Sequence, residues 1–319
     1  MRAPLFWKEK TFLSTVLLPV AALYGSCAKR RQKNTIPQKL PVPVICVGNL
    51  VAGGAGKTPV SLALGILLKE HGRKAHYLSR GYKGSLKGPV LVNPALHSAE
   101  EVGDEPLLLA AILPTWVAKD KIAGAKAAIA AGAEIIMMDD GFQNPSLHKD
   151  VSLLVIDGGY GFGNERLMPA GPLRETIAAA MERASAILLL GEDKQDVLRH
   201  VPEVKPVLRA NVEPAPAALS LQDKHVVAFA GIARPHKFYR TLQQLNCVIK
   251  EMVAYPDHHI FSAHDMARLR SKAKEQHAQL VTTTKDYVRL PASLREEVTE
   301  VPVEVVFGDE RAVLHMMGV

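Results

Sequence analysis

The chain has 319 residues, enough for two domains of ordinary size, with 48% hydrophobic and 22% charged residues. That composition is typical of a folded globular protein with a substantial core. A formal net charge of +7 suits an anionic partner, such as phosphates or a membrane surface. With 5% aromatic residues and no base-stacking motif, nucleic acid is the weakest candidate for that partner, and we expect none. The cysteines, Cys27, Cys46 and Cys247, form no C-x-x-C pair, which indicates reduced thiols in a cytosolic compartment and argues against a zinc site.

The first apolar stretch, residues 11–25, has basic residues on both sides. It is shorter than the roughly 20 residues of a membrane-spanning helix, and it contains Pro19. A secretory signal is one interpretation, because Cys27 resembles a lipoprotein cleavage site, but Tyr24 spoils the cleavage pattern. An ordinary core helix is another. We favour residues 1–33 as a membrane-associating helix and basic segment, with the apolar side in the lipid interface and the basic residues on anionic headgroups.

The most informative stretch is residues 41–59, PVPVICVGNLVAGGAGKTP. A short apolar run, a glycine-rich loop and Gly-Lys-Thr predict a buried strand, a phosphate-binding loop and a helix, whereas a glycine-rich loop alone is often only a turn. Lys57 would reach the β- and γ-phosphates, and the Thr58 hydroxyl would bind Mg²⁺. Val51 stands where the strict pattern has glycine. The residues expected to hold the nucleotide phosphates are Gly53, Gly54, Ala55, Gly56, Lys57 and Thr58.

Strands and helices alternate after this loop, which predicts an α/β fold with a parallel sheet. In this first domain, 34–201, we expect strands at 42–47, 74–78, near 90, and at 115–118, 134–138, 151–157 and 186–190. Prolines punctuate residues 202–220, which we interpret as a linker. A second α/β domain is expected over residues 221–319, with strands at 225–230, 247–253, 279–283 and 303–307.

Acidic residues occur at two informative places. Asp139 and Asp140 follow an apolar strand downstream of the loop, where a Walker B carboxylate holds Mg²⁺ or its water. The alternative is an Asp-Gly turn, but the phosphate loop favours the metal. Asp104 lies in Gly103-Asp104-Glu105-Pro106 and is first interpreted as a helix cap, because Asp is a favoured N-cap and Pro suits the first turn.

Three other features carry less specific signals. Arg80 at a strand end would meet a phosphate or lie solvated in its loop. Residues 158–175 form a loop too long for an idle connection, which suits a segment facing a substrate. His258 and His259 are adjacent, and a pair in a loop suits metal ligands, general bases or surface residues; spacing alone favours the surface.

Taken together, eight motifs in order resemble those of the tetraacyldisaccharide 4'-kinase family, the lipid A 4'-kinases of Gram-negative bacteria. The resemblance covers nearly the whole chain, and only the loop is decisive by itself. The motifs are VGNLVAGGAGKTP, SRGYKG, VGDEP, DDGFQ, LMPAGPLRE, GIARP, PDHHIF and TTTKD.

The resemblance implies phosphoryl transfer from ATP, with Mg²⁺, to the 4'-hydroxyl of a tetraacylated glucosamine disaccharide 1-phosphate. It implies two α/β/α sandwich domains, the first a P-loop NTPase-like parallel sheet, with the active site in the cleft between them. It also implies peripheral attachment to the cytoplasmic face of the bacterial inner membrane, and no obligate protein partner is evident.

The matching motifs also imply roles for particular residues. Asp104 becomes the expected catalytic base, and His258 its partner, either accepting the proton onward or holding Asp104 in its working state. Arg174 and Glu175 are expected near the nucleotide and the metal, with Arg174 and Lys57 stabilising the transferred phosphoryl group. The family's own loop is non-standard at the position of Val51.

Two other functions fit parts of the sequence. A MinD-like or ArsA-like switch ATPase shares the loop and a membrane-associating helix, but such ATPases carry a lysine before the double glycine, where this chain has Ala52. It would hydrolyse ATP without lipid. A nucleotide-dependent membrane scaffold is a non-enzymatic alternative, for which Asp104 and Asp139 would be superfluous.

Overall fold

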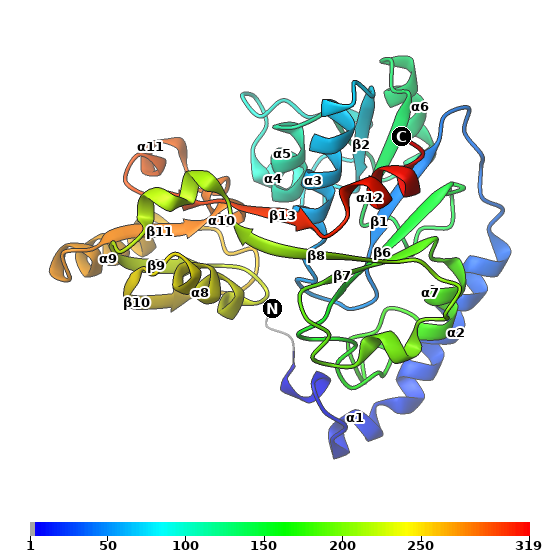
Figure 1. The fold of residues 1–319 in the computed structure, drawn as a ribbon, viewed down its shortest axis with the longest axis horizontal. Helices are drawn as coiled ribbons and strands as arrows, with labels where there is room; N and C mark the ends of the chain where they lie inside the picture. The colour runs from blue at the N-terminus through cyan, green and yellow to red at the C-terminus, as the bar shows by residue number, and fades with distance from the viewer. Residues whose placement is uncertain (1–3) are drawn as a thin grey trace. The chain divides into compact units, whose positions relative to one another are not determined.

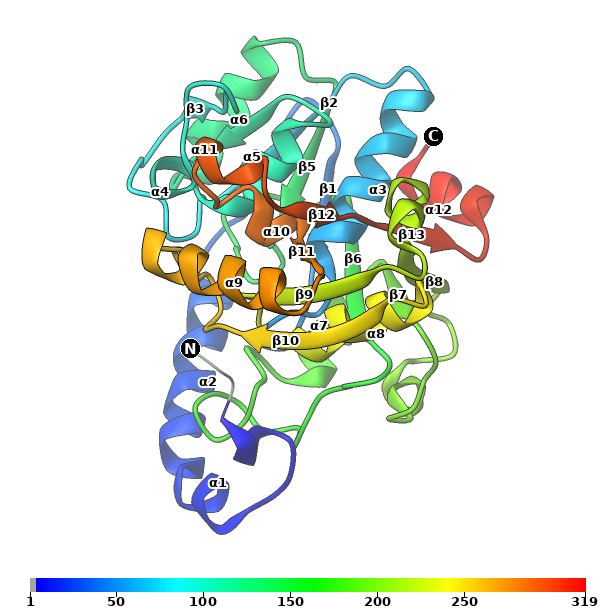
Figure 2. The same ribbon diagram turned by 90° about the vertical axis from the view of Figure 1, so that its left-hand side faces the viewer.

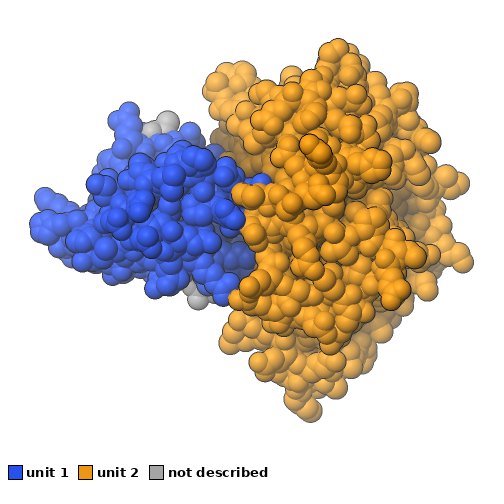
Figure 3. Space-filling model, in the orientation of Figure 1, with its two compact units in different colours: residues 1–2, 212–305 blue, residues 3–211, 306–319 orange. Residues whose placement is uncertain are grey.

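The computed structural model describes residues 4–319, which form two compact units (Figure 3). The larger unit comprises residues 4–211 and 306–319, and the smaller unit comprises residues 212–305. The chain passes from one unit to the other within strand β8, Val207–Pro214, and returns near the end of strand β13, Val303–Phe307.

Residues 202–220, expected to form a linker, contain the point at which the chain passes from the larger to the smaller unit, and they are largely in regular structure. Strand β8, which pairs with the preceding strand, and a 3-10 helix, Pro216–Leu221, together make up most of the segment. The buried Leu208 and Ala210 alternate with exposed residues, which is the pattern of a strand and outweighs the nearby prolines. The expected second domain also ran to residue 319, whereas residues 306–319 belong to the larger unit.

The larger unit is built on a mostly parallel sheet. Its other strands are β1 Val44–Gly48, β2 Ala75–Ser79, β3 Val90–Leu91, β4 Thr115–Val117, β5 Ile135–Asp139, β6 Val151–Asp157 and β7 Ala186–Leu190. Within residues 4–319, nine strands lie in the order β13-β8-β7-β6-β1-β5-β2-β4-β3 (Figure 1). All five residues of β1 are buried, as expected for a central parallel strand covered on both faces. The predicted α/β fold class is confirmed.

Helices cover both faces of this sheet. Helix α3, Lys57–Glu70, contacts β1, β2 and β5 on one side, and α6, Lys121–Ala130, packs with α7, Ile177–Arg183, in the core of the other. At the end of β1, a Cβ added to Gly48 would lie 2.3 Å from Cβ of Phe142. Only glycine allows that approach, which brings the DDGFQ motif against the strand. The remaining helices are α4 Ala99–Val102, α5 Asp104–Ala110 and α12 Glu310–Met317, with a 3-10 turn at Val197–His200.

The amino-terminal residues form two helices rather than one. A 3-10 turn, Leu5–Trp7, precedes α1, Phe12–Val16, and α2, Leu18–Asn34 (Figures 1 and 2). Pro19 lies in the first turn of α2, where its missing N–H costs nothing. No helix in the part of the chain that the structure describes is long and apolar enough to cross a membrane. The predicted segment begins at residue 1, so its first three residues lie outside the described part.

The smaller unit contains a four-stranded parallel sheet within residues 4–319, in the order β10-β9-β11-β12 (Figure 2). Helix α8 contacts β10, and α9 contacts β9 and β11. Its elements are β9 His225–Ala230, α8 Pro235–Gln244, β10 Val248–Ala254, α9 Ala263–Glu275, β11 Gln279–Thr283, α10 Thr284–Tyr287, α11 Ala292–Arg295 and β12 Thr299–Val301.

Candidate functional site

The glycine-rich loop connects β1 to α3 and ends at the helix N-terminus. Gly56 has φ +89° and is the N-cap of α3, and no side chain caps the helix there. A residue with a side chain would be strained at this φ, and its Cβ would also lie 2.5 Å from Leu190 Cδ1. Uncapped amide groups and the positive end of the helix dipole suit a phosphate, as the sequence predicted.

Val51 has a structural role that accounts for its departure from the strict loop pattern. It forms an antiparallel β-bridge with Leu173. On either side, Ala52 N donates to Pro172 O at 2.8 Å, and Arg174 N donates to Leu50 O at 2.9 Å. Valine suits this paired, extended backbone better than glycine does. The long loop that ends in Arg174 is therefore attached directly to the phosphate loop.

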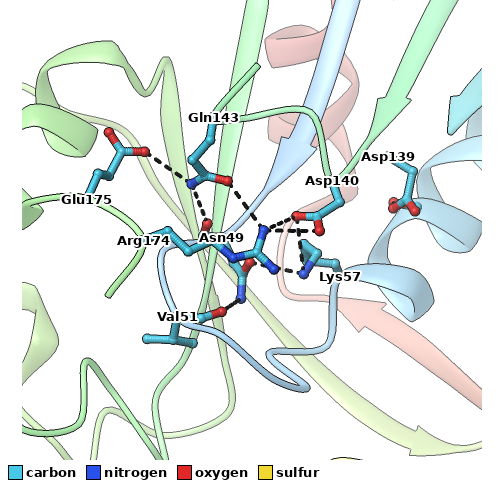
Figure 4. Close-up of polar contacts among 9 residues, drawn as sticks. Asn49, Val51, Lys57, Asp139, Asp140, Gln143, Arg174 and Glu175 are labelled. Atoms are coloured by element: carbon cyan, nitrogen blue, oxygen red, sulfur yellow. Dashed lines mark hydrogen bonds and ion pairs between the residues drawn. The ribbon is translucent and has the colours of Figure 1, made fainter. Parts of the chain in front are cut away.

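The side chains of Lys57, Asp140 and Arg174 meet at the end of this loop (Figure 4). Lys57 Nζ donates to Asn49 Oδ1 at 3.0 Å and lies 3.4 Å from Asp140 Oδ1. Arg174 Nη1 donates to both oxygens of Asp140, at 2.8 and 3.0 Å. Asn49 is fully buried and also donates to Val51 O, so the loop lysine is held by the loop itself.

The pKa values of the neighbouring Asp139 and Asp140 are shifted in opposite directions. Burial alone would raise the pKa of Asp140, but the charges of Lys57 and Arg174 outweigh it and lower that pKa to about 2. Burial raises the pKa of Asp139 to about 7, and the charges of Glu105 and Asp140 add to the effect. Asp139 Oδ1 accepts a hydrogen bond from Ser61 Oγ at 2.9 Å. A buried carboxylate that resists ionisation is one that a bound cation would stabilise.

The donor set fits Mg²⁺ bound together with a nucleotide. Among residues 4–319 there is no group of three or more His, Cys, Asp or Glu side chains that would hold a metal ion. Mg²⁺ is usually bound by one or two carboxylates plus substrate phosphates and water, so such a cage is not expected. Thr58, the second residue of α3, and Asp139, the last residue of β5, supply oxygens of the kind Mg²⁺ prefers.

Gln143 links this cluster to Glu175. Its Nε2 donates to Asn49 O at 2.9 Å and to Glu175 Oε1 at 3.1 Å, while its Oε1 lies 3.4 Å from Arg174 Nη1. Glu175 is buried and its other oxygen pairs with Arg183 Nη2 at 2.6 Å. The structure thus turns Glu175 toward Gln143 and Arg183, on the far side of Gln143 from Lys57 (Figure 4).

The amino-terminal helices contact the same network. Gln32 of α2 donates from Nε2 to Gln143 O at 3.0 Å. Burial raises the pKa of Tyr24, which is also on α2. The charge of Arg174 opposes this shift, and the charge of Glu175 adds to it. A helix on the surface of the larger unit therefore reaches the residues that hold the phosphate loop.

Hydrogen bonds join the long loop before Arg174 to the amino-terminal residues of the chain. Trp7 Nε1 donates to Pro169 O at 3.0 Å, and Asn164 Nδ2 donates to Phe6 O at 2.9 Å. Arg166 Nη1 donates to Ser14 Oγ at 2.7 Å.

Asp104 is not the helix cap that its local sequence first indicated. The N-cap of α5 is Gly103, with φ +89° and ψ 156°, and Asp104 is the first residue of the helix itself. Its Oδ1 accepts from Glu105 N at 2.9 Å, and the residue is buried. The capping interpretation is wrong because Gly103 takes a backbone conformation that places Asp104 one position into the helix.

The paired histidines lie in the smaller unit and have different surroundings. His258 has φ +59°, and its Nδ1 lies 3.3 Å from Arg289 Nη2. His259 contacts Asp265 Oδ2 at 3.1 Å and stacks on Tyr255 with ring centroids 4.5 Å apart. His259 is therefore engaged in local packing.

Sequence reasoning missed Lys121, the first residue of α6. The residue is only 4% exposed, and its Nζ has no hydrogen-bond partner within residues 4–319. Burial lowers the pKa of Lys121 to about 7, while the charge of Asp139 opposes the shift and the exposed Arg80 adds to it. An ammonium buried beside the expected metal ligand is placed for an anion. The local sequence, Asp120 followed by a lysine, gives only the signal of a capped surface helix.

Comparison with known proteins identifies a family for most of the chain. The family model for tetraacyldisaccharide-1-P 4'-kinase matches residues 13–318. A tetraacyldisaccharide 4'-kinase of Rhodospirillum centenum is 51% identical over 315 residues, covering 97% of this chain and 94% of the relative. One of Gluconacetobacter diazotrophicus is 48% identical over 314 residues, covering 98% and 96%.

A solved structure has the same fold over nearly its whole length. The structure of LpxK from Aquifex aeolicus in complex with ATP superposes with a TM-score of 0.78 at 30% sequence identity. The match covers 96% of this chain and 99% of that one.

We expect Lys121→Met to stabilise the fold. The pKa of Lys121 in the folded chain, about 7, lies below its ordinary 10.5, so the cost of burying the ammonium is full below about pH 7 and vanishes as pH approaches 10.5. Urea denaturation at about pH 6.5 should show an unfolding free energy about 1–4 kcal/mol higher, and the gain should shrink toward about pH 10. Lys126→Met, at an exposed position of the same helix, is the matched control. A loss of stability at acid pH would mean that the ammonium is satisfied in the fold.

Proposed function

The chain belongs to the tetraacyldisaccharide-1-P 4'-kinase family, and from that membership we propose how its residues share the reaction. It transfers the γ-phosphate of ATP to the 4'-hydroxyl of tetraacyldisaccharide 1-phosphate in lipid A biosynthesis. The observation that carries the residue assignment is the cluster of Lys57, Asp140 and Arg174 at the end of the glycine-rich loop. Two cations converge there on one carboxylate, at the uncapped N-terminus of α3. The switch ATPase is not favoured, because the match to the kinase family extends over both units.

The phosphate loop binds the nucleotide through its backbone. The amide groups of residues 53–58 would bind the phosphates at the uncapped N-terminus of α3, and Lys57 would pair with the β- and γ-phosphates. Thr58, Asp139 and Asp140 would hold Mg²⁺, which would neutralise phosphate charge when bound. The raised pKa of Asp139 supports this assignment, because a cation would favour its ionised form.

Charge stabilisation comes from side chains that are already in place. Lys57 and Arg174 pair with Asp140, and each donates a further hydrogen bond, Lys57 to Asn49 and Arg174 to Gln143. When phosphates enter, the two cations turn part of their charge to the oxygens of the transferred group. Glu175 acts indirectly, by holding Gln143 against the loop. Lys121, whose pKa burial lowers to about 7, adds a positive charge near Asp139 when it is protonated.

Proton abstraction belongs to Asp104. Phosphoryl transfer asks little covalent chemistry of the protein, but the attacking hydroxyl must lose a proton to a nearby acceptor. Asp104 is a buried carboxylate that does not serve as the helix cap, which suits the proton acceptor that membership of the kinase family implies at this motif. His258 is its partner.

The amino-terminal helices bind the cytoplasmic face of the inner membrane. Their large apolar side chains are exposed to an unusual degree, from 40% for Leu18 to 86% for Phe12. An exposed apolar surface on such helices, followed by basic residues in the last turns of α2, fits anionic lipid headgroups. The exposed apolar residues of this surface are Leu5, Phe12, Leu13, Val16, Leu18, Val20 and Leu23.

The direct test of the activity is transfer of label. Incubation with labelled ATP, Mg²⁺ and the disaccharide 1-phosphate precursor should place label in the lipid. Lys57→Ala should abolish that transfer without unfolding the chain, because the lysine serves phosphates rather than the core. Hydrolysis of ATP without lipid at an undiminished rate would favour the switch ATPase instead.

The base assignment predicts a particular response to Asp104→Asn. Asparagine keeps the size and the acceptor oxygen but cannot take a proton, so kcat should fall by roughly 10²–10⁴ while thermal stability and ATP affinity stay nearly unchanged. His258→Ala should also lower kcat, and the double variant should lose little more than the worse single one, because residues that act as a unit are not additive. Additive losses would mean that the two residues act separately.

The membrane assignment is tested by surface substitutions. Phe12→Ser with Leu23→Ser should weaken binding to anionic vesicles by roughly 10-fold or more, because each lost apolar side chain is worth about 1.5–3 kcal/mol when buried. The KM for lipid should rise more than the KM for ATP. Leu96→Ser, at an equally exposed residue away from these helices, is the control. Unchanged vesicle sedimentation would exclude this surface.

A further inference from the structure

The GIARP and TTTKD motifs have no part in the reaction as assigned above. Residues of both motifs contribute to the hydrogen-bond network that holds His258. GIARP follows β9, and TTTKD ends β11 and enters α10. Asp286, from the second motif, is fully buried. Its Oδ2 accepts from Gly231 N at 3.0 Å and from Thr283 Oγ1 at 2.7 Å. The carboxylate thus fastens the turn after β9 to the end of β11.

Arg289 completes this arrangement from one turn further along the chain. Its Nη1 donates to Asp286 Oδ1 at 2.8 Å and to Gly231 O at 2.9 Å. Its Nη2 lies 3.3 Å from His258 Nδ1, and His258 N donates to the same Gly231 O at 2.9 Å. One guanidinium therefore contacts the imidazole ring, the backbone oxygen that holds the His258 turn, and the buried carboxylate.

The cluster of Asp286, Arg289 and His258 depends on the backbone conformation at His258 and on the small size of Gly231. His258 has φ +59°, an uncommon conformation for a residue with a side chain, so its surroundings must hold it. A Cβ added at Gly231 would lie 3.0 Å from Asp286 Oδ1 and 3.2 Å from Pro256 O. A side chain at position 231 would press on both the carboxylate and the turn, so that one of them would have to shift by a few tenths of an ångström.

The chemistry of the pair fixes where the histidine carries its proton. An arginine side chain has only donors, so a hydrogen bond between Arg289 Nη2 and His258 Nδ1 requires the ring nitrogen to accept. A neutral histidine that accepts at Nδ1 carries its proton on Nε2. In an imidazolium, Nδ1 would also carry a proton, so that two N–H donors would face each other. Nε2 itself lies 3.8 Å from Asp257 Oδ2, which is too long for a hydrogen bond.

We infer that Arg289, anchored by Asp286, is a positioning residue for His258 in phosphoryl transfer, fixing the orientation of the imidazole and its neutral Nε2–H tautomer. The inference rests on the role proposed above for His258. A histidine held in this state donates from Nε2 to a carboxylate. In this tautomer the ring donates a hydrogen bond from Nε2 and does not take up a proton there.

Burial of the ion pair dictates the choice of variant. Arg289 is 5% exposed and Asp286 0%, so deletion of either charge would leave the other buried without compensation. Lysine keeps the charge and one bond to Asp286, but a point charge cannot also span Gly231 O and the imidazole. Arg289→Lys is therefore the test. Arg295→Lys is its matched control, because among the described residues Arg295 bonds backbone carbonyls on either side of Arg289, those of Leu290 and Val288, and lies over the ring of Tyr287 without bonding His258.

The kinetic experiment measures both variants in two backgrounds. With His258 present, Arg289→Lys should lower kcat by about 10-fold or more and leave the KM for ATP unchanged, while Arg295→Lys should keep kcat. In the His258→Ala background, Arg289→Lys should cost less than about 2-fold, because its effect passes through the missing ring. An equal loss in both backgrounds would overturn the inference.

A measurement on the ring itself does not depend on activity. Nitrogen-15 NMR of the full-length, histidine-labelled protein, with His258→Gln to assign the signal, should show the proton on Nε2 and none on Nδ1. Arg289→Lys should shift that signal toward a mixture of tautomers, and Arg295→Lys should not. A wild-type ring protonated at Nδ1 would refute the inference even if the variants were inactive. If His258→Ala kept full kcat while the ring had the expected tautomer, only the catalytic role of His258 would fail.

Discussion

The carboxylate of Asp140 is the point on which the nucleotide-binding end of the larger unit depends. Asp140 directly follows the last residue of β5, with φ +51°, and its carboxylate pairs with Lys57 from the phosphate loop and Arg174 from the long loop. Without this negative charge two buried or half-buried cations would face each other across the loop. With it, the positive groups that phosphoryl transfer needs are held in position before any phosphate arrives, which is what makes electrostatic stabilisation effective.

The glycine-rich loop, the parallel sheet and the acidic strand end follow from local patterns, and the sequence predicts each of them. The loop has a fixed order of strand, glycines and Lys-Thr, and buried parallel strands have few alternatives to continuous apolar runs. The position of Asp104 is different. Its neighbours Gly103 and Pro106 fit a capped helix as well as the observed one, and only the φ of Gly103 decides between the two. In the segment after residue 202 the sequence indicates a connection between domains but not its strand, because prolines at strand ends resemble those of a linker.

Residues whose role comes from tertiary contact were beyond the reach of the sequence. Lys121 begins a helix after a capping aspartate, and nothing local says that the sheet and its loops bury it. Gln143 lies inside the recognised DDGFQ motif, yet its bonds to Asn49 and Glu175 join segments far apart in the chain. The pairing of Arg289 with His258 spans 31 positions and carries no periodic signature. Such contacts are specified by the fold as a whole, and the local pattern constrains them weakly.

The bonds from Trp7, Ser14 and Gln32 mean that the proposed lipid-binding surface is not a detachable module. These side chains pair with Pro169, Arg166 and Gln143, so the two helices and the loop that carries Arg174 form one folded piece. Exchange of the amino-terminal helices between relatives would succeed only if that loop were exchanged with them. The two segments should therefore have diverged together as lineages adapted to different membranes.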